Sequence, residues 1–289
     1  MKRIFSLFVL LVIFLSCSAG PEVTISDDNL AAAVREALGL GPNDPISQKK
    51  FQALEKLSAD SKGIKNLMGI EKATGLKTLE LRKNQIEDLA PLSELTQLTN
   101  LYLGDNQISD ITPLTSLTQL IDLDIVANQI SDINTLTNLT QLTNLYLSDN
   151  KISDIKPLAN LTQLELLWLD KNQISDINTL TDLTQLARLG IELNQVSDIK
   201  PLAKLTQLTT LYLSDNKISD IQSLTNLTQL EVLSLNRNQI SDMKPITNLI
   251  QLKELYLTEN SIQDMEPLRK LKKQLPDLVI DIEIPPAGN

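Results

Sequence analysis

The stretch from Leu142 to Gln163 reads L-T-N-L-Y-L-S-D-N-K-I-S-D-I-K-P-L-A-N-L-T-Q, and it decides the fold. The same pattern recurs every 22 residues, with starts at Leu54, Leu76, Leu98, Leu120, Leu142, Leu164, Leu186, Leu208, Leu230 and Leu252. We number the positions of each repeat 1 to 22 from this first leucine. A fixed period of this length predicts a solenoid, in which each repeat forms one coil and stacks on its neighbours.

The opening of each repeat predicts a short strand, because its apolar residues alternate with polar ones. In Leu145-Tyr146-Leu147 the two leucines are expected to point into the solenoid and Tyr146 to point out. A single repeat cannot bury its own leucines. The stacked strands are therefore expected to form a parallel sheet over one continuous core.

Position 9 is asparagine in nine successive repeats: Asn84, Asn106, Asn128, Asn150, Asn172, Asn194, Asn216, Asn238 and Asn260. An inward-pointing amide has two donor hydrogens and an acceptor oxygen. Such amides can form hydrogen bonds with the backbone groups that a tight turn leaves unpaired. Buried backbone N–H and C=O groups require such partners. We interpret this row as structural. The first repeat has Lys62 instead, which indicates a transition from an end cap.

Position 13 is aspartate in the same nine repeats: Asp88, Asp110, Asp132, Asp154, Asp176, Asp198, Asp220, Asp242 and Asp264. Six of these repeats have a proline three positions later, as at Pro157. An aspartate caps a helical turn, and a proline fixes φ where the chain bends. We therefore expect 3₁₀ turns and loops on the convex side. A calcium site is the alternative, but the aspartates lack the closely spaced oxygen ligands of a calcium loop.

Residues 1–16 have the layout of an export signal, with Lys2 and Arg3 before an apolar run from Ile4 to Leu15. The only cysteine, Cys17, follows directly. This arrangement resembles a bacterial lipoprotein signal, which implies cleavage before Cys17 and lipidation of that residue. Ordinary cleavage after Ala19 and secretion is the alternative.

The composition narrows the classes of partner. Removal of residues 1–16 would take away two basic residues, leaving 24 of the 26 against 36 acidic residues, a net charge of −12. An acidic exported protein is a poor candidate for nucleic acid or for anionic membrane surfaces. We expect the protein to contact a membrane only through the lipid anchor. We also expect it to be a monomer.

Residues 22–53 do not repeat and predict a helical N-terminal cap. Residues 26–29 (S-D-D-N) offer a helix N-cap, and a helix is expected from Leu30 to Leu38. A second helix is expected from Gln48 to Leu57. Such a cap would cover the open end of the core.

The repeats span residues 54–273, and residues 274–289 are expected to form a C-terminal cap strand and tail. The stretch from Leu275 to Ile280 echoes one more strand, shifted by one residue from the repeat register.

Several motifs resemble those of bacterial internalins, which are leucine-rich repeat proteins. The stretches D-D-N-L-A-A-A-V-R-E-A-L-G-L from Asp27 and L-S-A-D-S-K-G-I-K-N-L-M-G-I from Leu57 resemble the internalin cap, and I-S-D-I-x-P-L-A-x-L-T-Q-L is similar to internalin repeats. The resemblance spans residues 23–272. It implies an α/β solenoid: a right-handed leucine-rich repeat horseshoe or arc with a concave parallel sheet. No Ig-like domain, wall-sorting motif or repeat-rich tail is recognisable, so host-cell invasion is not carried over.

All four tyrosines and the one tryptophan stand at position 5, which is expected to face solvent on the concave sheet. Tyrosine and tryptophan are enriched in binding hot spots. The high strand propensity of tyrosine and tryptophan, together with duplication of whole repeats, explains part of this shared position. Polar residues at neighbouring outward positions include Arg188, and Asp124 shares position 5. The predicted partner-binding residues are Tyr102, Asp124, Tyr146, Trp168, Arg188, Tyr212 and Tyr256.

We interpret the chain as a non-catalytic cell-surface or secreted module that binds a protein partner through its concave face. Binding of carbohydrate or peptidoglycan by the same aromatic side chains is the first alternative. A phosphatase-regulator-like intracellular scaffold is the second, and the export signal argues against it. The absence of histidine and the single cysteine exclude His-dependent triads and the usual zinc sites. We expect no cofactor and no metal.

Overall fold

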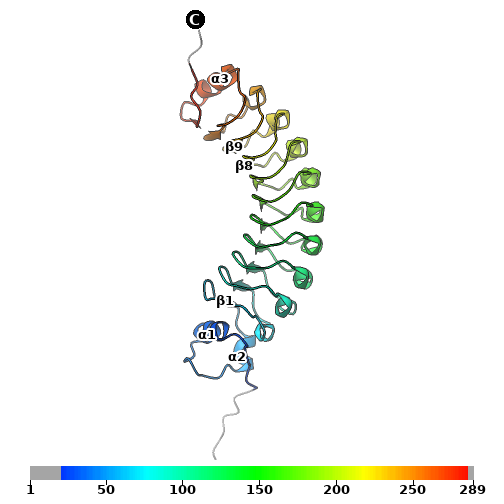
Figure 1. Cartoon of the computed structure of the whole chain (residues 1–289), viewed down its shortest axis with the longest axis vertical. Helices are drawn as coiled ribbons and strands as arrows, with labels where there is room; N and C mark the ends of the chain where they lie inside the picture. The colour runs from blue at the N-terminus through cyan, green and yellow to red at the C-terminus, as the bar shows by residue number, and fades with distance from the viewer. Residues whose placement is uncertain (1–20, 286–289) are drawn as a thin grey trace, which may run out of the picture.

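The computed structural model describes residues 21–285, which form a curved solenoid (Figure 1). Strands line the concave side and short helices line the convex side. The strands are β1 (Lys56–Ser58), β2 (Thr78–Glu80), β3 (Asn100–Tyr102), β4 (Asp122–Asp124), β5 (Asn144–Tyr146), β6 (Leu166–Trp168), β7 (Arg188–Gly190), β8 (Thr210–Tyr212), β9 (Val232–Ser234), β10 (Glu254–Tyr256) and β11 (Val279–Ile280). Together they confirm the predicted repeat solenoid.

The helices differ between the body of the solenoid and its ends. The ends carry the α-helices α1 (Asp28–Ala37), α2 (Gln48–Gln52) and α3 (Glu266–Gln274). The convex side carries the 3₁₀ helices η1 (Ile70–Lys72), η2 (Ala90–Leu92), η3 (Thr112–Ser116), η4 (Asn134–Asn138), η5 (Lys156–Asn160), η6 (Asn178–Asp182), η7 (Lys200–Lys204), η8 (Gln222–Asn226) and η9 (Lys244–Ile246). The expected 3₁₀ turns are thus present. None of the described helices is long and apolar enough to cross a membrane.

The sheet is parallel, and its strands follow one another in chain order from β1 to β11. Pairing keeps the 22-residue period, as in Asn144 opposite Leu166 and Tyr146 opposite Trp168. Apolar positions 1, 4, 6, 11, 14, 17 and 20 fill the core. In the repeat quoted above, these residues are almost completely inaccessible: Leu142, Leu145, Leu147, Ile152, Ile155, Leu158 and Leu161. The constant register therefore places each buried side chain against its counterpart in the next coil.

The position 9 asparagines, which we call the asparagine row, join successive coils. The Asn172 Oδ1 accepts the backbone N–H of Ile152 in the preceding coil at 3.0 Å. Its Nδ2 donates to the carbonyl oxygens of Leu147 and Leu169, both at 3.0 Å, and of Asp170 at 3.3 Å. The same contacts recur along the row. The structural interpretation of this row follows from these bonds, because the amides pair buried backbone groups on two coils.

The residue before each position 9 adopts a left-handed conformation. Position 8 has φ between 51° and 58° in all ten repeats: Ser61, Lys83, Asp105, Ala127, Asp149, Lys171, Leu193, Asp215, Arg237 and Glu259. This conformation costs energy for a residue with a Cβ atom. The asparagine row offsets that cost, since its amides bond to the carbonyls of positions 6 and 7.

The position 13 aspartates cap the convex turns. The Asp154 Oδ1 accepts the backbone N–H of Lys156 at 2.9 Å, where η5 begins. Equivalent bonds join Asp110 to Thr112 and Asp242 to Lys244. Within the described residues, no group of three or more potential ligand side chains could hold a metal ion. The geometry thus fits capping by the aspartates.

One carboxylate fastens the N-terminal cap. The Asp27 Oδ1 accepts the N–H groups of Asn29 and Leu30 at the start of α1, and its Oδ2 accepts those of Lys65 and Asn66 in the first coil. Burial opposes the charged form, but these four bonds outweigh it and lower the pKa of Asp27. Asp27 therefore both caps α1 and ties it to the repeats.

Two expectations about the ends of the solenoid are wrong. Helix α2 ends at Gln52 and not at Leu57, because Lys56–Ser58 pairs with β2 as the first strand. Strand β11 is shifted by three residues and not one, since Glu254 lies opposite Val279 instead of residue 276. Helix α3, which the sequence did not predict, takes the place of a shorter 3₁₀ turn and causes this shift. The export signal and Cys17 lie outside the described residues.

Candidate concave binding face

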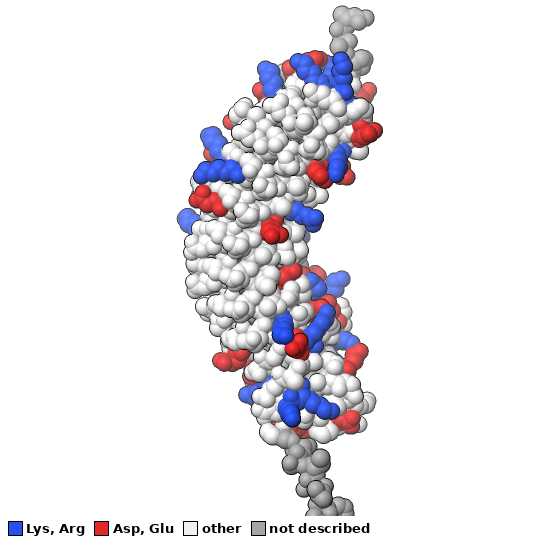
Figure 2. Space-filling view, turned by 180° about the vertical axis from the view of Figure 1, so that it is seen from behind, with Lys and Arg blue, Asp and Glu red and all other residues white. Residues whose placement is uncertain are grey.

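The concave face comprises the outward side chains at positions 3, 5 and 7 along β1 to β10. Position 5 supplies six of the seven predicted partner-binding residues, and Arg188 stands at position 3. The five aromatic residues among them are half-buried, and Arg188 is exposed. Figure 2 shows that charged residues gather toward the two ends of the molecule and along its hollowed edge, while much of the side between them is uncharged.

Two of the aromatic rings meet across an intervening strand. Trp168 on β6 stacks on Tyr212 on β8, with ring centroids 5.5 Å apart and planes inclined by 26°. Strand β7 lies between them and carries Gly190 at the same position. A Cβ atom at Gly190 would overlap Cε3 and Cζ3 of Trp168 and would lie 2.8 Å from Asp170 Oδ1. The missing side chain therefore gives the indole room to lie across β7.

An arginine organises the N-terminal part of the concave face. The Arg82 Nε donates to Asp124 Oδ2 at 2.7 Å, and its guanidinium lies 4.2 Å from the centre of the Tyr102 ring. Burial disfavours the Arg82 charge, but the bond to Asp124 and the nearby charges of Asp124 and Asp60 together outweigh burial and raise the pKa of Arg82. Asp124, whose side chain is only 14% exposed, is thus already paired. It holds Arg82 against Tyr102 and has little surface left for a partner.

Asp122, two residues before Asp124 on β4, is hydrogen-bonded through only one of its two carboxylate oxygens. The Tyr102 hydroxyl donates to Asp122 Oδ2 at 3.3 Å, and the Asn144 amide approaches the same oxygen at 3.5 Å. Asp122 Oδ1 is buried and has no hydrogen-bond partner within the described chain. Burial raises the pKa of Asp122. Asp122 is therefore the less completely hydrogen-bonded of the two carboxylates on β4.

The C-terminal part of the concave face contains an open hollow of about 400 Å³, which we call the tyrosine hollow. Its lining comprises Glu192, Tyr212, Ser214, Asp215, Ser234, Asn236, Arg237, Glu254 and Tyr256. Tyr212 and Tyr256 lie on β8 and β10, and between them β9 carries the small Ser234. The serine leaves space between the two tyrosines.

Sequence reasoning found the aromatic residues but missed the small and basic residues that arrange them. Arg82, Gly190, Ser214 and Ser234 were not singled out, although aligned repeats show glycine and serine where neighbours carry tyrosine or tryptophan. Arg188, which was singled out, makes no ion pair or hydrogen bond through its side chain within residues 21–285. Its charge is therefore available to a partner.

Comparisons with known proteins place these features in context. The family described as leucine rich repeats (2 copies) matches residues 74–115, 96–138, 140–185, 184–227 and 228–270. An internalin (inlF) from Listeria monocytogenes is 32% identical with a TM-score of 0.61, covering 90% of this chain and 96% of that one. Internalin C2 of the same organism is 37% identical with a TM-score of 0.62, covering 81% of this chain and 94% of that one.

A third structure shares the fold at lower identity. The functional domain of InlJ from Listeria monocytogenes includes a cysteine ladder and is 26% identical, with a TM-score of 0.73, covering 90% of this chain and 61% of that one. The present chain has a single cysteine and therefore cannot form such a ladder. No curated protein matches the sequence.

Proposed function

Because the chain belongs to the internalin-like leucine-rich repeat proteins of bacteria, we propose that it is a non-catalytic binding module of the cell surface whose concave face holds a protein partner. Internalin-like repeat proteins are typically non-catalytic, and the similarity suggests a surface or exported protein. The partner, and the use of this particular face, belong to the proposal.

The observation that carries the proposal is the position of the aromatic residues. All the tyrosines and the tryptophan lie half-buried on one face, and none of them is in the apolar core. Half-buried aromatic side chains can lose their remaining contact with water when a partner covers them, and such residues contribute strongly to binding. Gly190 leaves room for the Trp168 ring, and Arg82 lies against the Tyr102 ring. Both rings are therefore already ordered, which reduces the loss of side-chain entropy on binding.

The first experiment is capture of partners from bacterial-envelope and extracellular extracts by the purified protein. A variant with Tyr146, Trp168 and Tyr212 changed to alanine is run in parallel, after circular dichroism has shown that it is folded. We expect a protein that the parent retains and the variant loses. Equal capture by both proteins would refute a concave aromatic site, and capture only of glycan would favour carbohydrate binding instead.

We further propose export by the signal in residues 1–16 and lipidation at Cys17, so that the solenoid is tethered to the envelope. The basic start, the apolar run and the single cysteine directly after it support this proposal. Cells fed a clickable fatty-acid analogue should label the parent protein and not a Cys17→Ser variant. Equal labelling of both would exclude this residue, and no labelling of either would favour secretion after ordinary cleavage.

A further inference from the structure

The tyrosine hollow contains hydroxyl groups held beneath its rim. Ser214 and Ser234 are only 5% and 6% exposed, and their hydroxyls are hydrogen-bonded to each other. Ser234 donates in turn to Glu192 Oε1 at 3.0 Å. The Tyr256 hydroxyl donates to Glu254 Oε2 at 2.7 Å. Two carboxylates are thereby held at the hollow by neutral donors.

These two carboxylates have no cationic partner. Arg237 is the one cation in the lining, and it already bonds to Asp215 at 3.2 Å and to Glu259 at 3.0 Å. Glu192 and Glu254 form no ion pair within residues 21–285. The lining carries three carboxylates against one guanidinium, a net charge of −2. Burial raises the pKa of Tyr212, and the charges of Glu254 and Glu192 raise it further against the opposing charge of Arg188.

We propose that the tyrosine hollow receives an arginine or lysine side chain of the protein partner. This inference rests on the proposed function and adds the chemistry of the bound group. The aliphatic stem of such a residue can lie in the gap above Ser234, between Tyr212 and Tyr256. Its charged head can then reach Glu192 and Glu254, forming charge-assisted hydrogen bonds, and can contact the tyrosine rings.

The probes that test this inference are two libraries of nine-residue peptides with identical random flanks. One library has arginine at its centre, and the other has citrulline, which keeps the shape of arginine but carries no charge. We expect the purified protein to retain the arginine library roughly tenfold better, because a hydrogen bond between charged groups is stronger than one to a neutral group. An E192Q/E254Q variant should lose this preference.

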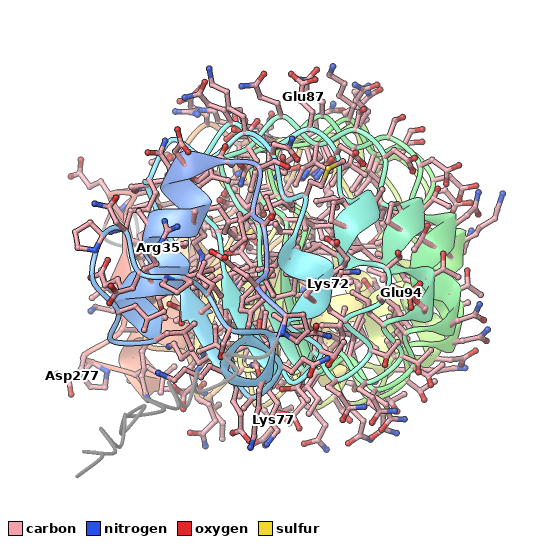
Figure 3. All side chains as sticks on the ribbon, turned by 90° about the horizontal axis from the view of Figure 1, so that it is seen from below. Arg35, Lys72, Lys77, Glu87, Glu94 and Asp277 are labelled. Carbon is pink, nitrogen blue, oxygen red and sulfur yellow. The ribbon has the colours of Figure 1, made fainter. Side chains whose placement is uncertain are left out.

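A matched control distinguishes the effect of the two carboxylates in the tyrosine hollow from the effect of the overall net charge. An E87Q/E94Q variant changes the net charge by the same amount, but Glu87 and Glu94 lie outside the strands, on either side of η2, and Figure 3 shows Glu87 at the outer edge of the coils. Both residues are exposed. The control should keep the arginine preference. The inference is overturned if the parent retains both libraries equally, if E192Q/E254Q keeps the preference, or if E87Q/E94Q loses it.

The outcomes also distinguish this inference from the proposed function. If a variant with Tyr146 and Trp168 changed to alanine loses the captured envelope protein, but the parent shows no preference for the arginine library, only the inference is overturned. A preference for arginine without aromatic-dependent capture of a protein overturns the proposed function. Glycan binding that E192Q/E254Q abolishes, with no peptide preference, would identify the hollow as a sugar site and overturn the inference.

Discussion

An Asn172→Ala variant is expected to lose about 3–5 kcal/mol of unfolding free energy, because each buried polar group left without a partner costs about 1–3 kcal/mol. The substitution removes the acceptor of the Ile152 N–H and the donor to the carbonyls of Leu147 and Leu169. These groups lie on two coils, so the loss weakens an interface between coils and not only one turn. In a stacked array, such an interface contributes directly to stability.

Urea denaturation followed by circular dichroism measures this effect. Asn178→Ala in the same repeat is the matched control, since Asn178 is exposed and its side chain makes no hydrogen bond within the described residues. The control should change the unfolding free energy by less than about 0.5 kcal/mol. If both variants unfold at the same urea concentration as the parent, the asparagine row does not have the structural role assigned to it.

A Gly190→Ala variant is expected to push the Trp168 indole off Tyr212 while leaving the backbone of β7 in place. The new Cβ would overlap the outer edge of the indole, and this edge can swing away more easily than the backbone can move. Loss of the stacked pair should cost about 1 kcal/mol of stability. Trp168 is the only tryptophan, so its fluorescence emission reports the change directly and should shift to longer wavelength as the ring becomes wetter.

Gly104→Ala provides the control for this substitution. Gly104 also lies on the concave face, but its nearest contact for a new Cβ is Asp124 Oδ1 at 3.1 Å, and the indole is not among its neighbours. The emission of this variant should match that of the parent. Unchanged emission in a folded Gly190→Ala protein would mean that Gly190 does not make room for the indole.

Features that repeat could be predicted from the sequence. The buried leucines, the asparagine row, the capping aspartates and the 3₁₀ turns each recur at one position, so a single physical argument covers them all. The placement of Tyr146, Trp168 and Tyr212 on the sheet follows from strand alternation in the same way.

Features that occur once could not be predicted in this way. Helix α3 forms where a longer helical segment buries Leu268 and Leu271 at the end of the core, and it moves the register of β11. The pairing of Asp124 with Arg82 joins residues 42 positions apart, on coils that are not adjacent in the sequence. Stacking of Trp168 on Tyr212 depends on an absent side chain at Gly190. Each of these depends on the particular neighbours of one residue and not on the repeat pattern.

The orientation of the sheet has a mechanical consequence. Successive strands lie side by side along the arc, so a pull between the two ends of the molecule separates neighbouring strands instead of sliding them past one another. Hydrogen bonds loaded in this way break a few at a time, so neighbouring coils separate one after another. Each released coil of 22 residues would lengthen the chain by roughly 75 Å. A solenoid of this kind would extend stepwise when its two ends are pulled apart, one coil after another, while the remaining coils keep their shape.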